Sequence, residues 1–274
     1  MPTAAALIAG YADYLRLTVP SQVIRRRGQI RRVLADLGDS PVSLEAVRRG
    51  LAQIRQVSAD HTYCQYVVSA RLFLAWAHRA GGLPADWSED LHAPRLRRPA
   101  PRYLGDEQIE QCLSLARRHG VYSEVLVALK SGLRVGELRQ LRWEHLLFGQ
   151  RIIIVQPLKA ALNPRVVPMH SMIYAELWPR RQSFGPLWPT RSIRVWQSKL
   201  DPLRRAMPAF TLGARFTGAG RGWHLFRHTF AVRLCRAGTP LTEIQQYLGH
   251  ADIQTTMIYA AYTVRQYNPN IEFA

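Results

Sequence analysis

A short stretch rich in proline and arginine interrupts an otherwise helical sequence pattern. Residues 92–102 read His-Ala-Pro-Arg-Leu-Arg-Arg-Pro-Ala-Pro-Arg, with three prolines and four arginines. Proline has no backbone N–H and fixes its own φ, so such a stretch is extended and stiff rather than helical. A chain of 274 residues is long enough for two hydrophobic cores. We therefore expect an N-terminal domain at 1–91, a basic linker at 92–103 and a second domain at 104–274.

Apolar residues in the first eighty positions recur at three- and four-residue spacings, which predicts helices throughout. Proline, glycine and serine positions between them predict helices over residues 4–17, 23–37, 44–57 and 61–80. The second of these carries an arginine run, Arg25, Arg26, Arg27, Arg31 and Arg32. In isolation such a run favours a solvated helix face, but in a chain this basic we favour a DNA-facing surface.

The formal net charge of +18 predicts a polyanionic partner, and nucleic acid fits best. Only three of the 37 basic residues are lysines. Arginine suits bidentate contact with phosphate, although a GC-rich genome would enrich it as well.

The sequence has no apolar run long enough to span a membrane, and its N-terminus matches a signal peptide poorly. We therefore expect a cytoplasmic protein. Three widely spaced cysteines fit neither a disulfide framework nor a zinc site, and we expect buried thiols and no metal.

Imidazole, guanidinium and phenol groups recur at short spacings near the C-terminus. His224 and Arg227 lie three residues apart on an expected helix that begins near Trp223 and ends at Gly238. Both side chains would then point the same way from its first turn and could reach one anion. His228 follows four residues after His224, where a buried, hydrogen-bonded histidine is the better interpretation.

Two shorter helices are expected after Gly238. Thr239-Pro240 predicts an N-cap and a first-turn proline for a helix that closes at the turn before His250. Asp252 then predicts the cap of a third helix, which carries Tyr259. Tyr262 and Tyr267 also follow His250, and the residues alone do not decide among the three phenols.

Two further elements lie upstream in the expected second domain. Arg134 and Glu137, within Ser-Gly-Leu-Arg-Val-Gly-Glu-Leu, sit three apart at a helix start. The β-branched runs 151–155 and 165–168 predict two strands of a long hairpin, and Lys159 follows the first. Residues 192–206 read as one amphipathic helix, and 208–222 as a glycine-rich loop.

These motifs together resemble the catalytic domain of the tyrosine recombinases, the phage integrase family. The resemblance rests on His-x-x-Arg at 224–227, Leu-Gly-His at 248–250, a tyrosine nine residues later, the Gly-Leu-Arg-x-x-Glu-Leu at 132–138 and a hairpin lysine. The turn after Lys159 departs from the family, with Ala-Ala-Leu where small polar residues are usual. The resemblance implies a mainly α fold with a small antiparallel β-sheet or hairpin, in a two-domain clamp around DNA.

The resemblance also implies a role for each residue in cutting and rejoining DNA through a 3′-phosphotyrosine, without metal, ATP or cofactor. Tyr259 is then the nucleophile, and Lys159 the acid for the leaving oxygen. The remaining implied catalytic residues are Arg134 and Arg227 as phosphate clamps, His224 as acid–base partner and His250 as a phosphate hydrogen-bond donor. Glu137 and His228 support the site. The expected DNA contacts are Arg95, Arg97 and Arg98 of the linker, together with Arg25, Arg26, Arg27, Arg31 and Arg32.

The implied partner is double-stranded DNA with inverted-repeat core sites. The resemblance further implies a tetramer on DNA held by the tail at 260–274, accessory DNA-bending proteins, and a nucleoid-associated protein of bacterial, archaeal or phage origin. Two alternatives stay open at this point. One is a type IB topoisomerase-like enzyme that only relaxes DNA, and the other is a non-catalytic DNA-binding regulator on the same fold.

Overall fold

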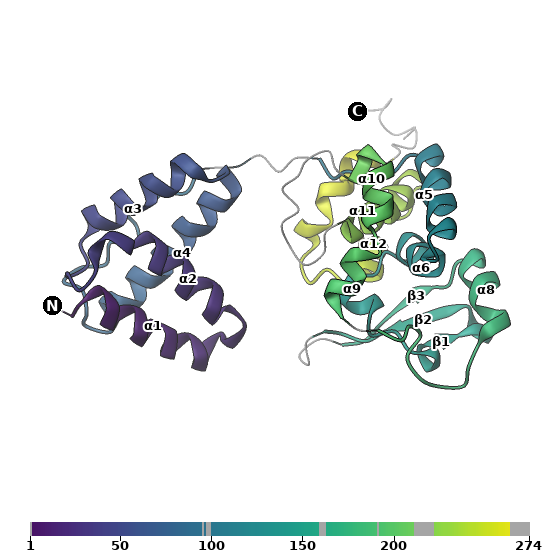
Figure 1. The fold of residues 1–274 in the computed structure, drawn as a ribbon, viewed down its shortest axis with the longest axis horizontal. Helices are drawn as coiled ribbons and strands as arrows, with labels where there is room; N and C mark the ends of the chain where they lie inside the picture. Colours follow the sequence, from purple (N-terminus) through teal and green to yellow (C-terminus); the bar gives the residue numbers. More distant parts are fainter. Residues whose placement is uncertain are drawn as a thin grey trace, which may run out of the picture. The chain divides into compact units, whose positions relative to one another are not determined.

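The structure is a computed structural model that describes residues 2–94, 96, 100–158, 163–190, 192–210 and 222–263. Its internal contacts divide the chain into two compact units, Met1–Arg98 and Pro99–Ala274, both drawn in Figure 1. The division falls inside the proline- and arginine-rich stretch 92–103. Each unit has a hydrophobic core made of its own residues.

Four helices form the N-terminal unit: α1 (Ala4–Thr18), α2 (Val23–Val33), α3 (Leu44–Val57) and α4 (Asp60–Arg79). Two 3₁₀ turns, η1 (Pro20–Gln22) and η2 (Ala35–Leu37), follow α1 and α2. The hydroxyl oxygens of Thr3 and Ser43 accept backbone N–H groups at the starts of α1 and α3. All four expected helices are confirmed, although α2 ends at Val33, before the expected end at residue 37.

Close packing of α3 against the end of α2 depends on a glycine. A Cβ at Gly50 would lie 1.8 Å from the carbonyl oxygen of Val33, so no side chain fits there. The core that these helices enclose is built around Tyr11 and Phe73, whose rings meet edge to face at 5.4 Å. The N-terminal unit is thus a small four-helix domain.

Eight helices are described in the C-terminal unit. They are α5 (Asp106–Arg118), α6 (Tyr122–Ser131), α7 (Val135–Leu138), α8 (Ser171–Leu177), α9 (Ile193–Ser198), α10 (Asp201–Ala206), α11 (Trp223–Arg236) and α12 (Leu241–Leu248). Helix α6 lies at the centre and packs against α5, α8 and α11. Its residues 123–129 are all buried, so α6 is the core helix of this unit.

Short 3₁₀ helices connect these elements. They are η3 (Trp143–His145), η4 (Phe148–Gln150), η5 (Trp178–Arg180), η6 (Pro208–Phe210), η7 (Ile253–Thr255) and η8 (Met257–Tyr262). The last of them carries Tyr259. In the described part of the chain, no helix is both long enough and apolar enough to cross a bilayer.

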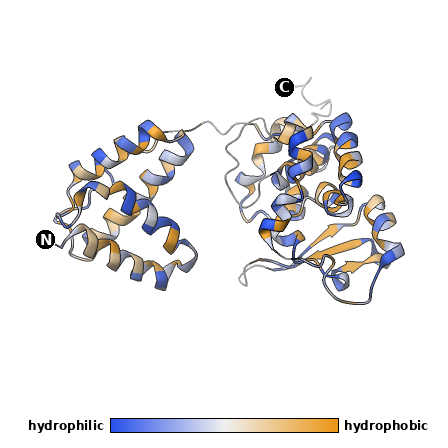
Figure 2. Ribbon diagram, in the orientation of Figure 1, coloured by the Kyte–Doolittle hydropathy of each residue, from blue (hydrophilic) through white to orange (hydrophobic). Residues whose placement is uncertain are grey.

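A three-stranded antiparallel sheet completes the unit, with strands in the order β1 (Leu146–Leu147), β2 (Ile152–Val155) and β3 (Arg165–Pro168). Ile153 pairs with Val167, and Val155 pairs with Arg165. Ile153, Val155 and Val167 are buried, as strand alternation requires, and the strands are mostly apolar in Figure 2. The expected hairpin and the mainly α fold class with a small antiparallel sheet are confirmed. The two-residue strand β1 was not expected.

The segment 192–206 is not the single helix that its periodicity predicts. Helix α9 ends at Ser198, and α10 starts at Asp201. Pro202, the second residue of α10, has no N–H to bond to a preceding turn, so a helix cannot run through it without loss of a hydrogen bond. The expected glycine-rich loop 208–222 starts instead with a 3₁₀ helix over Pro208–Phe210. Its residues 211–221 lie outside the described residues.

The elements after α11 differ from expectation in two places. Pro240 is the N-cap of α12 rather than its first residue, because its ψ of 140° is extended and lies outside the helical region. Asp252 does cap a helix, since its carboxylate accepts the Gln254 N–H at 2.9 Å. That helix, η7, ends at Thr255, and Tyr259 lies on the next one. Gly238 has a φ of 82°, which confirms it as the helix stop after α11.

The three cysteines are free thiols. Cys112 and Cys235 are buried and Cys64 is half-buried, so the expectation of buried thiols holds for two of them. Burial raises the pKa of the Cys112 thiol to about 12. Its thiol therefore stays protonated and packs as a small apolar side chain.

Candidate active site

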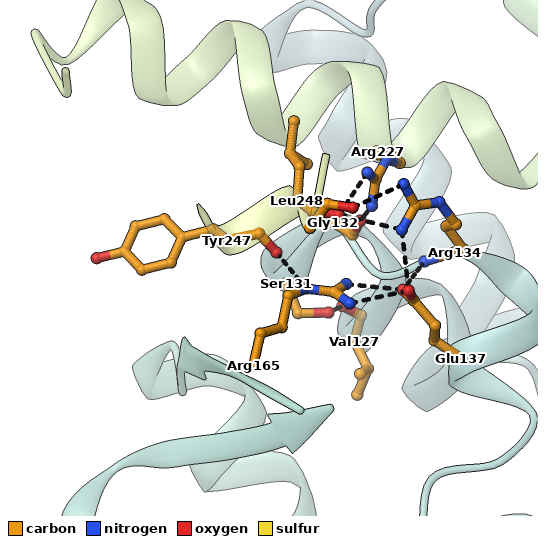
Figure 3. Close-up of polar contacts among 10 residues, drawn as sticks. Val127, Ser131, Gly132, Arg134, Glu137, Arg165, Arg227, Tyr247 and Leu248 are labelled. Atoms are coloured by element: carbon orange, nitrogen blue, oxygen red, sulfur yellow. Dashed lines mark hydrogen bonds and ion pairs between the residues drawn. The ribbon is translucent and has the colours of Figure 1, made fainter. Parts of the chain in front are cut away.

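Two arginines from distant parts of the chain meet at the C-terminal end of α12. Arg227 of α11 donates from Nη2 to the Leu248 carbonyl at 2.6 Å and from Nη1 to the Gly132 carbonyl at 2.8 Å. Arg134, the N-cap of α7, donates to the same Leu248 carbonyl at 3.2 Å. Figure 3 shows both guanidinium groups pointing toward that carbonyl. One peptide oxygen therefore fixes two cations side by side.

The helix end explains why these cations are tolerated together. The last carbonyls of a helix lack internal partners and carry partial negative charge, which guanidinium donors satisfy. Arg134 takes a second one, the Gly249 carbonyl, at 3.2 Å. Burial, followed by repulsion from Arg134, lowers the pKa of Arg227 to about 9. A bound anion would relieve that repulsion, so the pair is suited to hold a phosphate.

Glu137 is the counter-charge of the site and is almost fully buried. Its Oε1 accepts from Arg134 Nη1 at 3.0 Å, and its Oε2 accepts from the Arg134 backbone N–H at 2.8 Å. Burial alone would raise the pKa of this carboxyl, but the hydrogen bonds and charge of Arg165, with those of Arg134, hold it below its usual range. Glu137 is thus an anion that holds both the backbone and the guanidinium of Arg134.

Arg165 also belongs to the site, although it was not among the expected site residues. Its Nη1 and Nη2 donate to the two carboxylate oxygens of Glu137 at 2.9 and 2.8 Å, and its Nε donates to the Tyr247 carbonyl at 2.8 Å. A signal for it exists in the strand pattern. Arg165 has the same parity as the buried Val167 on β3, and an arginine on the buried face of a strand needs a carboxylate partner.

Gly249 has a structural role between these groups. It takes the left-handed conformation, with φ 62°, and a Cβ there would lie 3.0 Å from three side-chain atoms of Arg165. The glycine of Leu-Gly-His therefore ends α12 and makes room for Arg165 against the turn. This packing brings the start of β3 to the end of α12.

His224 and His250 are held neutral near the arginines. Burial, followed by the charges of Arg227 and Arg134, lowers the pKa of His224, and the same causes lower the pKa of His250 to about 3. The Nδ1 of His250 is 2.8 Å from the hydroxyl of buried Thr256. We assign Thr256 as the donor in this bond, which leaves the proton of His250 on Nε2. His250 can then donate one hydrogen bond to an anion at neutral pH.

A pocket of about 530 Å³ opens beside these groups. Arg134, Glu137, Arg165 and His250 line it together with Pro157, Leu158 and Asn163 from the hairpin. Cationic and hydrogen-bonding groups thus face a space large enough for a phosphate group and part of its sugar. The pocket lies wholly within the C-terminal unit.

Tyr259 is buried and hydrogen bonded. It is 1% exposed, among side chains of α11 and α12 that include Val232, Ile244 and Leu248. Its hydroxyl lies 2.7 Å from Nδ1 of His228. Burial raises the pKa of Tyr259 to about 12, so the phenol is protonated at neutral pH.

Comparison with known proteins finds a family match over the segment that carries four of the expected site residues. Residues 219–265, which contain His224, Arg227, His250 and Tyr259, match the phage integrase family. The chain is 30% identical over 217 residues to the tyrosine recombinase XerC of Pseudomonas syringae pv. tomato, covering 76% of this chain and 71% of that protein. The chain belongs to the tyrosine recombinase family.

This tyrosine recombinase also resembles a relative along nearly its full length. It is 26% identical over 272 residues to the tyrosine recombinase XerA of Pyrococcus horikoshii, covering 98% of this chain and 93% of that one. Two solved structures share the fold. One is the Tn1549 transposon integrase in complex with a circular intermediate DNA, with a TM-score of 0.71 and 17% identity, over 100% of this chain and 98% of that one. The other is the Lambda integrase bound to DNA, with a TM-score of 0.68 and 16% identity, over 91% and 92%.

The structure brings some expected site residues of this recombinase together and leaves others undescribed. Arg134, Glu137, Arg227 and His250 meet at the end of α12, and Tyr259 meets His228. His224 lies on the first turn of α11, close enough to the arginines for their charge to shift its pKa. Lys159, the linker arginines Arg95, Arg97 and Arg98, and tail residues 264–274 lie outside the described residues.

The arginine run of the N-terminal unit lies on α2. Arg25, Arg31 and Arg32 are exposed, whereas Arg26 and Arg27 are half-buried. Arg25 donates to the Gln22 side chain at 2.7 Å. The exposed members have the access that phosphate contacts need, and a solvated helix face has the same exposure.

Proposed function

Because the chain belongs to the tyrosine recombinase family, it is a site-specific DNA recombinase, and we propose that Tyr259 carries the covalent step. The observation that best supports this is the meeting of Arg134 and Arg227 on the Leu248 carbonyl. A phosphodiester has two non-bridging oxygens, and a fixed pair of guanidinium groups can bind both. Arg134 also lines the pocket, whereas Arg227 is buried, with 3% of its surface exposed.

The proposed reaction exchanges one phosphoester bond for another. The phenolic oxygen of Tyr259 attacks phosphorus, and a bond forms between them while the bond from phosphorus to the 5′ oxygen breaks. The phenolic proton passes to His224, and Lys159 gives a proton to the departing 5′ oxygen. The strand is left as a 3′-phosphotyrosine. Attack by a 5′-hydroxyl from another strand reverses the step, so rejoining needs no external energy.

The other residues of the site stabilise the transition state. Arg134, Arg227 and the Nε2–H of His250 face the charge that grows on the non-bridging oxygens. Glu137 does not react. Its buried carboxylate, held by Arg165, keeps the Arg134 guanidinium in place before DNA arrives. Such preorganisation contributes more than a flexible cation would, because little reorganisation is needed during the reaction.

The proposed partner is double-stranded DNA with inverted-repeat core sites. The Tn1549 and Lambda integrase structures are described as DNA complexes, and the net charge of +18 suits the same partner. By family resemblance, the two domains clamp the duplex, with the α2 arginines and the linker arginines on phosphates. Four protomers then assemble on DNA through the tail at 260–274, with accessory DNA-bending proteins. The protein is nucleoid-associated and of bacterial, archaeal or phage origin.

A nicked suicide substrate tests the assignment of Tyr259. Footprinting on DNA that flanks the gene identifies the bound site, and a nick close to the cleavage position then lets the released fragment diffuse away. Wild-type protein is expected to form a covalent DNA adduct, and Tyr259→Phe to bind the same DNA without one. Tyr262→Phe, three residues later, is the matched control and keeps the adduct. An adduct that persists in Tyr259→Phe would exclude Tyr259 as the nucleophile.

A further inference from the structure

The side chain of the proposed nucleophile is buried in this structure. Tyr259 is 1% exposed, whereas attack requires its oxygen to contact a phosphorus atom directly. Its ring packs within the cluster formed by α11 and α12, and its hydroxyl faces His228 rather than solvent. The described conformation of η8 is therefore a resting one, and Tyr259 must leave it before cleavage.

The hydrogen bond to His228 has a clear direction. Burial lowers the pKa of His228 to about 4, with smaller effects from His224 and Arg227, so the imidazole is neutral at pH 7. The neighbouring phenol is also neutral, as its raised pKa requires. A phenol is a better donor than a neutral imidazole N–H, so the Tyr259 hydroxyl donates to Nδ1 and the imidazole proton sits on Nε2. The bond joins two neutral groups and transfers no proton.

We propose that His228 is a positioning residue that stores Tyr259: its Nδ1 accepts the phenolic hydrogen in the DNA-free protein and releases it when the nucleophile moves to the phosphate. The proposal rests on Tyr259 being the nucleophile. His228 is well placed for this task, because it follows Arg227 directly on α11, a helix whose buried face is fixed in the core. The acceptor is rigid, so only η8 needs to move.

The element that carries Tyr259 is suited to such movement. Helix η8 has six residues in 3₁₀ geometry, whose hydrogen bonds are weaker than those of an α-helix. At its far end, the Tyr262 hydroxyl donates to the Pro101 carbonyl at 3.2 Å, and its ring meets Tyr103 edge to face at 5.3 Å. Side-chain contacts, more than backbone bonds, therefore hold η8 on the domain.

A route from the pocket to this contact is also present. His250 lines the pocket and bonds to Thr256, the residue just before η8. A phosphate that draws on the Nε2–H of His250 thus acts on a side chain whose other nitrogen holds the base of η8. DNA binding and release of Tyr259 are linked through one imidazole.

Hydrogen exchange of the DNA-free protein tests the storage contact without relying on catalysis. His228→Leu removes the acceptor, and amides of residues 257–263 are expected to exchange about fivefold faster, the ratio given by one ordinary hydrogen bond. Tyr259→Phe removes the donor and is expected to have the same effect. Because both variants remove one bond, the double variant should exchange no faster than either single one. Amides of α1, in the other unit, are the internal reference.

His228→Asn is the conservative rescue, since its Oδ1 can stand where Nδ1 stands in histidine. It is expected to return the exchange of 257–263 to within twofold of wild type. On the suicide substrate at saturating DNA, His228→Leu should cleave at least as fast as wild type, because storage opposes attack. Exchange that stays unchanged in His228→Leu, or additive effects in the double variant, would overturn the proposal.

A loss of cleavage in His228→Leu without faster exchange would also overturn it, because His228 would then act in the chemical step. Failure of the proposed function would give a different experimental result. If the adduct persists in Tyr259→Phe, the nucleophile is assigned wrongly, while the exchange experiment still reports whether His228 holds Tyr259.

Discussion

Arg165 shows how a residue without a chemical role can decide whether this site works. It donates to both oxygens of Glu137, and Glu137 in turn fixes the backbone and side chain of Arg134. The planar guanidinium fork matches a carboxylate in a way that an ammonium group does not. A positive charge at position 165 is therefore not sufficient to hold the Glu137 carboxylate in place.

We expect Arg165→Lys to lower cleavage far more than DNA binding. A lysine keeps one positive charge but loses the bidentate contact and the bond to the Tyr247 carbonyl, so Arg134 is held less firmly. The lost charge-assisted hydrogen bonds should also cost about 2 kcal/mol of unfolding free energy. Single-turnover cleavage, DNA affinity and urea unfolding measure the three effects.

The matched control for this prediction is Arg71→Lys. Arg71 pairs with Glu89 at 2.9 Å, and both side chains are exposed, at 37% and 85%. An exposed pair contributes little, so this change should leave stability and cleavage as they are. If Arg165→Lys behaved like Arg71→Lys, the position of Glu137 would not depend on the bidentate contact with the Arg165 guanidinium.

At the scale of elements, the sequence predicts what local patterns determine. The helix from Trp223 and the strands 152–155 and 165–168 are recoverable because their apolar spacing and stops are local. The break between α9 and α10 is local as well, and Pro202 marks it. The contact between His228 and Tyr259 is not recoverable, since it depends on where η8 packs against α11, a tertiary choice that no spacing encodes.

The candidate site likewise has features that the sequence predicts and features that it does not. The convergence of Arg134 with Arg227 follows from the family resemblance rather than from periodicity, because the 92 residues between them must fold to bring them together. Arg165 was missed because its strand run reads as apolar, and its parity became informative only beside the buried Glu137.

The turn after α12 gives a prediction at this scale, with a second glycine as control. Gly249 and Gly120 both follow helices with positive φ, at 62° and 65°. A Cβ at Gly249 meets Arg165 at 3.0 Å, whereas a Cβ at Gly120 meets nothing within 4 Å. Alanine at either position should lose roughly 1 kcal/mol to backbone strain. Gly249→Ala should lose about 1 kcal/mol more through overpacking.

Only Gly249→Ala should also reduce cleavage, because the Gly249 and Leu248 carbonyls hold the two arginines. Urea unfolding followed by tryptophan fluorescence, together with the suicide-substrate assay, separates the effects. Equal losses in the two variants, with cleavage intact, would mean that the turn serves only as a helix stop.

At the scale of the whole molecule, the net charge of +18 is spread over both units, so DNA binding should weaken steeply as salt rises. Each phosphate contact adds about 0.9 to the magnitude of the slope of log K against log salt. The slope therefore counts contacts, which affinity at a single salt concentration does not.

The α2 arginines can be tested by that count. If Arg31 and Arg32 contact phosphates, the double variant Arg31→Gln, Arg32→Gln should reduce the magnitude of the slope by about 2. Arg16→Gln is the control, because Arg16 is equally part of the N-terminal unit but is paired with Asp13 on α1. Fluorescence anisotropy with a duplex that carries the footprinted site gives the slope. A slope unchanged from wild type in the double variant would identify the α2 run as a solvated helix face, and the linker and C-terminal unit would then supply the phosphate contacts.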